Sequence, residues 1–160
     1  MTELPNPPIP LHVAVALSQV GVRESPKGSN RGVQVDLYTE GRAEPWCGHF
    51  VAWCFREAQT PIPGDRPSKR HGNPLASVTH TERIFKEHDW FYTEPRVGDV
   101  VFFKARGRSD RGPGRHIGIV SDVGLKDIEV VDGNWGDAVT RRRVARNSPQ
   151  ISGYGRHGAL

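Results

Sequence analysis

The sequence changes from helical to strand-like patterns close to residue 88, and this change limits the possible folds more than any other feature. After it come short apolar runs separated by Gly, Pro and Asp, such as "VGDVVFF", "RHIGIVSDV", "DIEVVDGN" and "DAVTRRRVA". Before it, apolar residues recur at helical spacing within 11–20, 33–42, 47–58 and 75–88. Helices followed by strands favour an α+β domain, with N-terminal helices packed on a C-terminal antiparallel sheet.

The length and composition fit one globular domain. The chain has 160 residues, of which 36% are hydrophobic and 25% charged, so it has enough apolar residues for a core and does not resemble a disordered chain. We expect a proline-rich lead-in over 1–10, one catalytic domain over 11–154 and a tail over 155–160. No apolar run approaches the roughly 20 residues that cross a membrane.

The stretch "PWCGHFVAWC" (45–54) places a cysteine at the start of a predicted helix. A thiol there lies at the positive end of the helix dipole, beside unpaired N–H groups, and both favour the nucleophilic thiolate. On a helix, Cys47 and Cys54 would lie about 10 Å apart, too far for a disulfide. The Cys-x-His spacing of Cys47 and His49 does not converge on a metal ion, because the two side chains point about 200° apart. Cys47 is therefore either a nucleophile or a small core residue.

His116 is the histidine best placed to serve a cysteine. In "RHIGIV" it points to the strand face opposite Ile117 and Ile119, so the folded sheet can present it to a helix N-terminus. Asp132 and Asn134 end the next strand at i and i+2, on one face if the strand is regular. Either could accept a hydrogen bond from the imidazole, although "DGN" is also strong turn chemistry.

Four motifs, in order, resemble the CHAP family, the cysteine, histidine-dependent amidohydrolases/peptidases of the papain-like clan. They are "PWCGHFVAWC", "VGDVVFF", "RHIGIV" and "VDGN", and the likeness covers roughly residues 11–154. The resemblance implies a papain-like fold. It also implies Cys47 as nucleophile, His116 as base and then acid, and Asp132 and Asn134 as its polar partners. Most such domains cut amide bonds in bacterial peptidoglycan.

Three features depart from the family pattern. Asp132 stands where the family often has Glu, so a shorter side chain must reach the histidine. His49 occupies a position that is often small or acidic. Some relatives bind Ca²⁺ through Asp-rich loops, but no such cluster lies near Cys47. We therefore expect neither a metal nor another cofactor.

Four residues are candidates for contact with the substrate. Trp46 and Trp135 are expected to line the groove, although packing explains Trp46 nearly as well. The backbone N–H of Cys47 is expected to hold the oxyanion, and Asn30 and Tyr38 are candidates for the second donor.

Two short segments carry the basic character of the chain. Residues 104–115 and 141–146 hold nine of the 22 Lys and Arg residues, and elsewhere acidic residues outnumber basic ones. Such segments indicate either a polyanionic partner or a solvated arginine-rich surface. Contact with an anionic wall polymer is expected through Arg106, Arg108, Arg111, Arg141, Arg142 and Arg143.

The expected function is cleavage of amide or peptide bonds in peptidoglycan, as an endopeptidase or N-acetylmuramoyl-L-alanine amidase, by a monomeric endolysin or delivered lysin. The N-terminal apolar run lacks the flanks of a signal peptide. We therefore expect synthesis in a bacterial cytoplasm and action in the periplasm or wall after delivery through a holin or by injection. The alternatives are a peptide–polyamine amidase and a polyanion-binding module with an idle cysteine. No recognised nucleic-acid motif is present.

Overall fold

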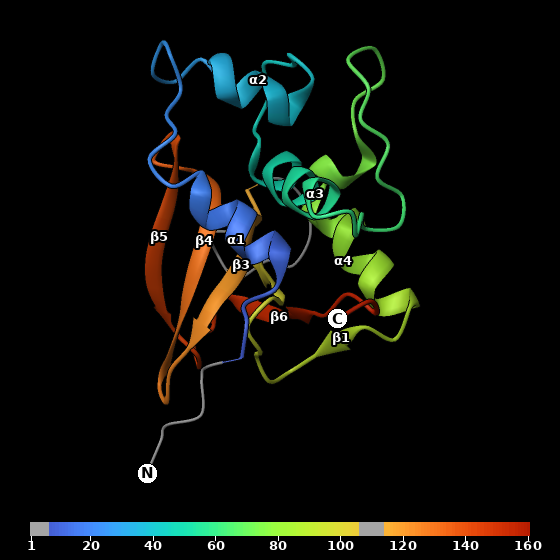
Figure 1. Cartoon of the computed structure of the whole chain (residues 1–160), viewed down its shortest axis with the longest axis vertical. Coiled ribbons are helices and arrows are strands. Elements are labelled where there is room, and N and C mark those ends of the chain that lie inside the picture. Colours follow the sequence, from blue (N-terminus) through green and yellow to red (C-terminus); the bar gives the residue numbers. More distant parts are fainter. Residues whose placement is uncertain (1–6, 106–113) are drawn as a thin grey trace.

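The computed structural model describes residues 7–105 and 114–160, which form an α+β domain (Figure 1). The helices are α1 (Leu11–Ser18), α2 (Val33–Thr39), α3 (Cys47–Glu57), the 3-10 turn η1 (Pro74–Ala76) and α4 (Val78–Glu87). The strands are β1 (Phe91–Tyr92), β2 (Val100–Phe103), β3 (His116–Val123), β4 (Asp127–Trp135), β5 (Ala138–Ala145) and β6 (Ile151–Gly155). The predicted fold class, with helices first and an antiparallel sheet second, is confirmed.

Local chemistry explains where two helices differ from the predicted bounds. The second helix ends at Thr39 because Glu40 adopts a left-handed conformation, with a φ of 59°. The predicted helix over 75–88 is split at Ser77, whose hydroxyl accepts a hydrogen bond from the backbone N–H of His80 at 3.2 Å. Ser77 thereby caps α4, and η1 precedes it as a separate turn.

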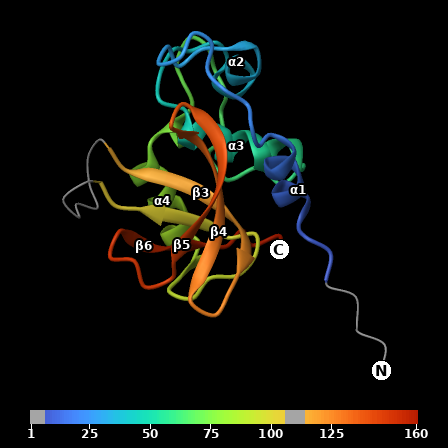
Figure 2. The ribbon, with the colours of Figure 1, turned by 90° about the vertical axis from the view of Figure 1, so that its left-hand side faces the viewer.

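The sheet has the strand order β1-β6-β2-β3-β4-β5, and every pair of neighbours is antiparallel. The expected meander holds from β2 to β5. β6 then returns across the sheet to pair with β2 and not with β5, so the sheet is not a simple meander. Figure 2 shows the sheet from another side, where its strong twist is visible.

Apolar side chains fill both faces of the sheet. On the face toward the helices, Ile117, Ile119 and Val131 pack with α3 residues such as Phe50. On the other face, a smaller cluster contains Val101, Phe103, Val120, Ile128, Val130 and Tyr154. The central strands are therefore buried on both sides, which explains their nearly continuous apolar sequences.

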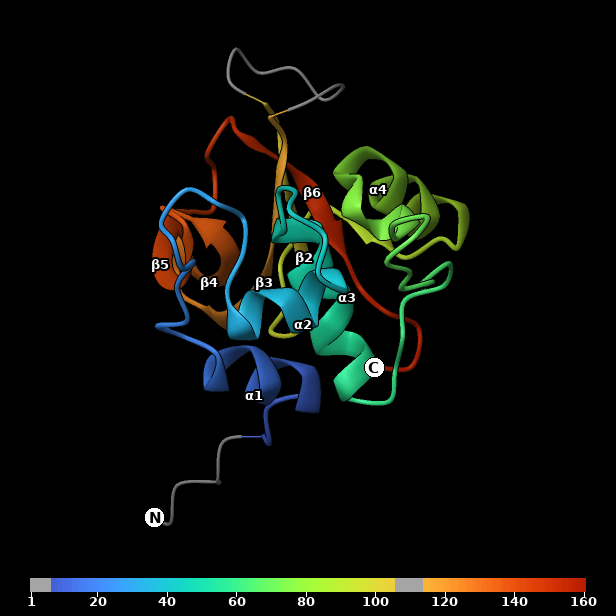
Figure 3. The same cartoon turned by 90° about the horizontal axis from the view of Figure 1, so that it is seen from above.

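Helix α3 is the central element of the helical layer. It packs on β3 and β4 and also contacts α1, α2 and η1, an arrangement visible from above in Figure 3. Its start is anchored by Glu24, which is buried and accepts hydrogen bonds from Trp46 Nε1 at 2.9 Å and from the backbone N–H of Asn30 at 2.7 Å. The loop before α2 is thus joined to the residue that precedes Cys47.

Among residues 7–105 and 114–160, no helix has the length and apolar character needed to cross a bilayer.

The close packing of β4 on α3 depends on a glycine. A Cβ at Gly133 would lie 2.7 Å from Phe50 Cβ and 2.8 Å from Trp46 Cζ3, so Gly133→Ala must push the helix away from the strand. We predict that this substitution lowers the free energy of unfolding by about 2–3 kcal/mol. Urea denaturation measures the loss. Leu125→Ala, in an exposed turn, is the control and should change stability by less than about 0.5 kcal/mol. Equal stability of the Gly133→Ala variant and the parent would contradict this packing.

Candidate active site

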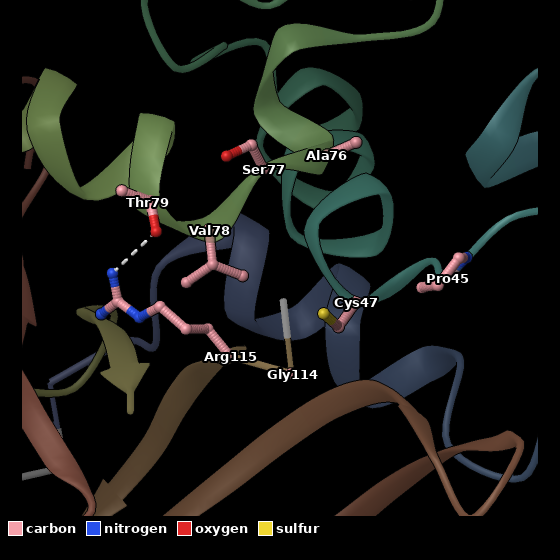
Figure 4. A pocket seen from close by; sticks show the side chains of 8 residues that line it. All are labelled: Pro45, Cys47, Ala76, Ser77, Val78, Thr79, Gly114 and Arg115. Carbon is pink, nitrogen blue, oxygen red and sulfur yellow. Dashed lines mark hydrogen bonds between the residues drawn. The ribbon is translucent and has the colours of Figure 1, made fainter. Parts of the chain in front are cut away.

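Cys47 is the first residue of α3, as the sequence predicted. Its backbone N–H, like those of any first helical turn, has no partner within the helix. The side chain is largely buried, with 9% of the residue exposed, and makes no disulfide; Cys54 is also free and fully buried. Figure 4 shows the Cys47 sulfur directed into a pocket, toward Val78 and Gly114.

His116 is the first residue of β3, so its ring lies at the end of the sheet, where it interacts with the side chain of Cys47. Its Nε2 donates a hydrogen bond to Asp132 Oδ2 at 2.7 Å. This bond leaves Nδ1 as the ring nitrogen available to the cysteine. The structure thus brings together Cys47, His116 and Asp132 from α3, β3 and β4.

Asp132 is fully buried and accepts several hydrogen bonds. Its Oδ1 accepts from Thr140 Oγ1 at 2.7 Å. Its Oδ2 accepts from His116 and from two nitrogens of Arg142, Nε at 3.0 Å and Nη2 at 2.8 Å. A buried carboxylate with this many donors is held in one orientation, so it also fixes the plane of the imidazole.

Gly118 makes room for this carboxylate. It lies on the same strand face as His116, and a Cβ there would come within 2.5 Å of Val130 Cγ1 and 3.1 Å of Asp132 Cβ. A glycine at this position therefore leaves space for a neighbour. The neighbour is the adjacent strand's own side chains, which can therefore approach His116 closely enough for an aspartate to reach it.

The protonation of the pair follows from these contacts. Burial opposes the charge on His116, but hydrogen bonds to Asp132 and Cys47, with their charges, outweigh it and raise the pKa of His116 to about 9. Burial likewise opposes ionisation of Asp132, yet the hydrogen bond and charge of His116, together with Arg142, lower its pKa below the ordinary value. At neutral pH the pair is an imidazolium beside a carboxylate.

A bulge at the end of β4 decides which side chains face the site. Asp132 pairs with Thr140 and Trp135 with Ala138, so Gly133 and Asn134 together lie opposite Val139. Asn134 adopts a left-handed conformation, with a φ of 58°. The strand is therefore not regular here, and Asp132 and Asn134 do not share a face as they would in a regular strand. Of the two candidate partners the histidine bonds to Asp132, and the bulge brings Trp135 close to His116, with ring centroids 5.3 Å apart.

Arg142 lies between the carboxylate and two aromatic rings. Its guanidinium carbon is 3.7 Å from the ring centroid of Trp135 and 5.3 Å from that of Phe103. These rings cover the guanidinium while its Nε and Nη2 hold Asp132. The sequence placed Arg142 in a basic segment but contained no sign of this role. The strand register Val130↔Arg142, which brings it near Asp132, is a property of the folded sheet.

Two pockets of about 290 Å³ each adjoin the Cys47–His116 pair. The first pocket is lined by Pro45, Cys47, Ala76, Ser77, Val78, Thr79, Gly114 and Arg115 (Figure 4). The second pocket is lined by Phe103, Lys104, Gly114, His116, Trp135, Arg142, Val144, Ser148 and Gln150. Both pockets reach Gly114, one on the cysteine side of the pair and one on the histidine side.

A buried ion pair fixes the strand end that carries His116. Arg115 Nη2 donates to Glu82 Oε2 on α4 at 2.8 Å and to Ser152 Oγ on β6 at 3.1 Å. Although burial opposes ionisation of Glu82, the hydrogen bonds from Arg115 and Ser152 lower its pKa. The sequence assigned the segment that contains Arg115 either to a polyanionic partner or to a solvated surface; Arg115 itself instead joins β3, α4 and β6.

A comparison with family models matches the CHAP domain over residues 38–134, which is more than half of the chain and includes Cys47, His116 and Asp132. The chain belongs to the CHAP domain family. The α+β arrangement is consistent with the papain-like fold of that family. Membership implies a cysteine- and histidine-dependent amidohydrolase or peptidase, and CHAP domains typically act on peptidoglycan. No match was found among curated proteins or among solved structures.

Three residues expected to contact substrate in this CHAP domain lie elsewhere. Trp46 is fully buried, where its indole N–H binds Glu24 and its ring stacks on Tyr38 at 5.7 Å. Tyr38 is also buried, and its hydroxyl donates to Gln19 Oε1 at 2.6 Å. Asn30 lies in the loop tied to Glu24 and lines neither pocket. These positions do not fit groove-lining or oxyanion roles, whereas Trp135 lines the second pocket and is 47% exposed.

The arginines of β5 are paired within the sheet. Arg141 binds Glu129 at 2.8 Å, and Arg143 binds Asp127 at 2.7 Å and Asp122 at 3.0 Å. This pairing does not support an anionic polymer as the partner of Arg141 and Arg143. Arg142 pairs with Asp132, a carboxylate that it shares with His116. Arg106, Arg108 and Arg111 lie outside the described residues.

The structure accounts for His49. The residue is buried on α3, and its Nε2 lies 2.7 Å from Glu44 Oε1, a carboxylate that also binds Arg42. His49 thus fastens the segment before α3 to the helix, away from the reactive pair. Within the part of the chain that the structure describes, no group of three or more His, Cys, Asp or Glu residues could hold a metal ion.

The hydrogen bond to Asp132 generates a prediction for the titration of His116. We expect an imidazole pKa of about 9 in the parent, measured by NMR, and a lower value in Asp132→Asn, because a neutral amide no longer stabilises the imidazolium. Since the folded-state pKa exceeds the ordinary value of about 6.5, the pair's contribution to stability is complete below that pH. It is lost as pH rises through about 9. Asp36→Asn, at an exposed ion pair with Arg31, is the control. An unchanged His116 titration in Asp132→Asn would contradict the assignment.

Proposed function

We propose that this chain hydrolyses an amide or peptide bond of bacterial peptidoglycan, with Cys47 as nucleophile, His116 as acid and base, and Asp132 as the group that orients the histidine. One observation carries the proposal: a cysteine at a helix start, a histidine and a buried carboxylate interact in series at the meeting point of two pockets. This is the arrangement of a Cys–His nucleophile system with a third group that holds the base.

In the first step, the Cys47 sulfur adds to the amide carbonyl, next to the imidazolium of His116. The oxyanion forms at the start of α3, where the unpaired backbone N–H of Cys47 donates a hydrogen bond to it. The C–N bond then breaks, and the nitrogen takes the proton from His116. The products are a free amine and a thioester on Cys47.

In the second step, water replaces the amine. Neutral His116 accepts a proton from the water as its oxygen adds to the thioester carbonyl. The C–S bond breaks, which releases a carboxylic acid and returns the Cys47 sulfur and the imidazolium of His116 to their starting states. Asp132 stays ionised in both steps, because its bonds to Thr140 and Arg142 do not depend on the proton carried by His116.

The biological setting is a separate part of the proposal. We propose further that the chain is made in a bacterial cytoplasm and acts in the periplasm or wall, as an endolysin or delivered lysin, after a holin or an injection apparatus has brought it there. The typical action of the family on peptidoglycan supports the wall as its place of action.

The two cysteines make a matched pair for testing the nucleophile. We predict that Cys47→Ala and Cys47→Ser abolish release of fragments from purified sacculi, because no other thiol lies at a helix start beside His116 among the described residues. Cys54→Ala should retain activity and lose about 1–2 kcal/mol of stability as a core change. Turbidity of sacculi measures the rate, and circular dichroism verifies folding. Undiminished lysis by folded Cys47→Ala would refute the mechanism.

Substitutions of His116 and His49 distinguish a role in the reaction from a purely structural role. We predict that His116→Ala lowers the rate at least about 100-fold. His49→Ala should keep most of the activity per folded molecule, because His49 contacts Glu44 and not the reactive pair. In the parent, kcat/KM should fall as pH rises through about 9, where His116 loses its proton. A rate that keeps rising beyond pH 10 would show that no imidazolium is needed.

A further inference from the structure

The two pockets beside the reactive pair differ in charge. Of the described residues that line the first pocket, most are small or carry a hydroxyl group, and the one cation among them, Arg115, forms an ion pair with Glu82. The second pocket is lined by Lys104 and Arg142 in addition to His116. Of the described residues that line it, none is a carboxylate, since Asp132 lies buried behind Arg142. Among the described residues, the second pocket therefore carries more positive charge than the first.

Arg142 retains a donor for a ligand in the second pocket. Its Nε and Nη2 bind Asp132, while Nη1 has no hydrogen-bond acceptor among the described residues. The side chain is 22% exposed, so it reaches the pocket. A guanidinium stacked on Trp135 is rigid, which reduces the entropy lost when its free edge binds an anion. Lys104, on the same pocket wall, adds a second positive charge.

The chemistry of the pair orients the substrate across the two pockets. His116 must reach the leaving nitrogen to protonate it, and it lines the second pocket. Cys47 must reach the carbonyl carbon, and it lines the first pocket. The acyl part of the substrate therefore occupies the first pocket, and the amine part occupies the second.

We propose that the second pocket is a carboxylate subsite, formed by Arg142 and Lys104, for the residue that contributes the amine of the scissile bond. The enzyme then selects amides whose leaving part bears a free carboxylate near the nitrogen. Stem peptides of peptidoglycan carry such carboxylates. This inference rests on the proposed function and adds the identity of the group next to the cleaved bond.

The test compares two forms of one soluble muropeptide that the enzyme cleaves. One form has a free carboxylate on the residue that provides the amine, and the other has a carboxamide there. We expect the parent to cleave the carboxylate form with a kcat/KM roughly ten-fold or more above that of the carboxamide form, as loss of a charge-assisted hydrogen bond would produce. Amidation of a carboxylate on the acyl side, in a further muropeptide form, should change the rate little.

Variants assign the preference to the pocket. Arg142→Gln should slow both reactions, because it loosens Asp132, and should also bring the ratio of the two rates close to one. Lys104→Gln should lower the ratio, because it removes one of the positive charges that line the second pocket. Thr140→Val is the control for catalytic damage, because it removes one hydrogen bond to Asp132 but no charge and no side chain of the second pocket, so it should slow both substrates and preserve the ratio. Lys126→Gln, at an exposed turn, is the control for net charge.

The outcomes separate this inference from the proposed function. Cleavage of both forms at equal rates by the parent, or a preference that persists in Arg142→Gln, would overturn the carboxylate subsite and leave the hydrolase intact. Failure of the folded parent to cleave sacculi and every muropeptide tested would overturn the proposed function itself.

Discussion

The buried carboxylate of Asp132 is the group on which the geometry of the site depends. It has no exposed surface, and its two oxygens accept hydrogen bonds from Thr140, His116 and Arg142. An isolated carboxylate in such a place would be costly, so each donor stabilises the ionised form that holds the imidazolium. Gly118 supplies the space that lets an aspartate side chain come close enough to bind His116. The reactive histidine thus has one tautomer and one orientation, set by neighbouring strands of a single sheet.

The hydrogen bonds that hold Asp132 also link the orientation of His116 to substrate binding. Arg142 stabilises Asp132 with two nitrogens and lines the second pocket, while the bulge in β4 brings Trp135 over its guanidinium. A group that binds there would touch the residue that holds the base in place. Substrate recognition on the amine side and the orientation of His116 are therefore coupled through a single side chain.

Much of the fold and the central residues could be predicted from the sequence, because helical and alternating periodicities reflect burial directly. The start of α3 at Cys47 and the strand that carries His116 are examples. The predictions failed where contacts between residues far apart in the sequence determine which way a side chain points. One example is the bulge in β4, which places Trp135 instead of Asn134 on the side of His116. This bulge depends on the pairing of β4 with β5. The burial of Trp46 depends on Glu24, 22 residues earlier. Charge counts along the chain likewise cannot show which arginine pairs with which strand.

The central claim is that the Cys47 sulfur attacks the substrate and that His116 activates this sulfur. The most direct test treats the protein with a muropeptide fragment whose scissile carbonyl is replaced by a thiol-reactive electrophile, and maps the adduct by mass spectrometry of peptides. The account predicts one adduct on Cys47, loss of activity in proportion to labelling, and much slower labelling in His116→Ala. Labelling of Cys54, or complete inactivation with Cys47 unmodified, would contradict it.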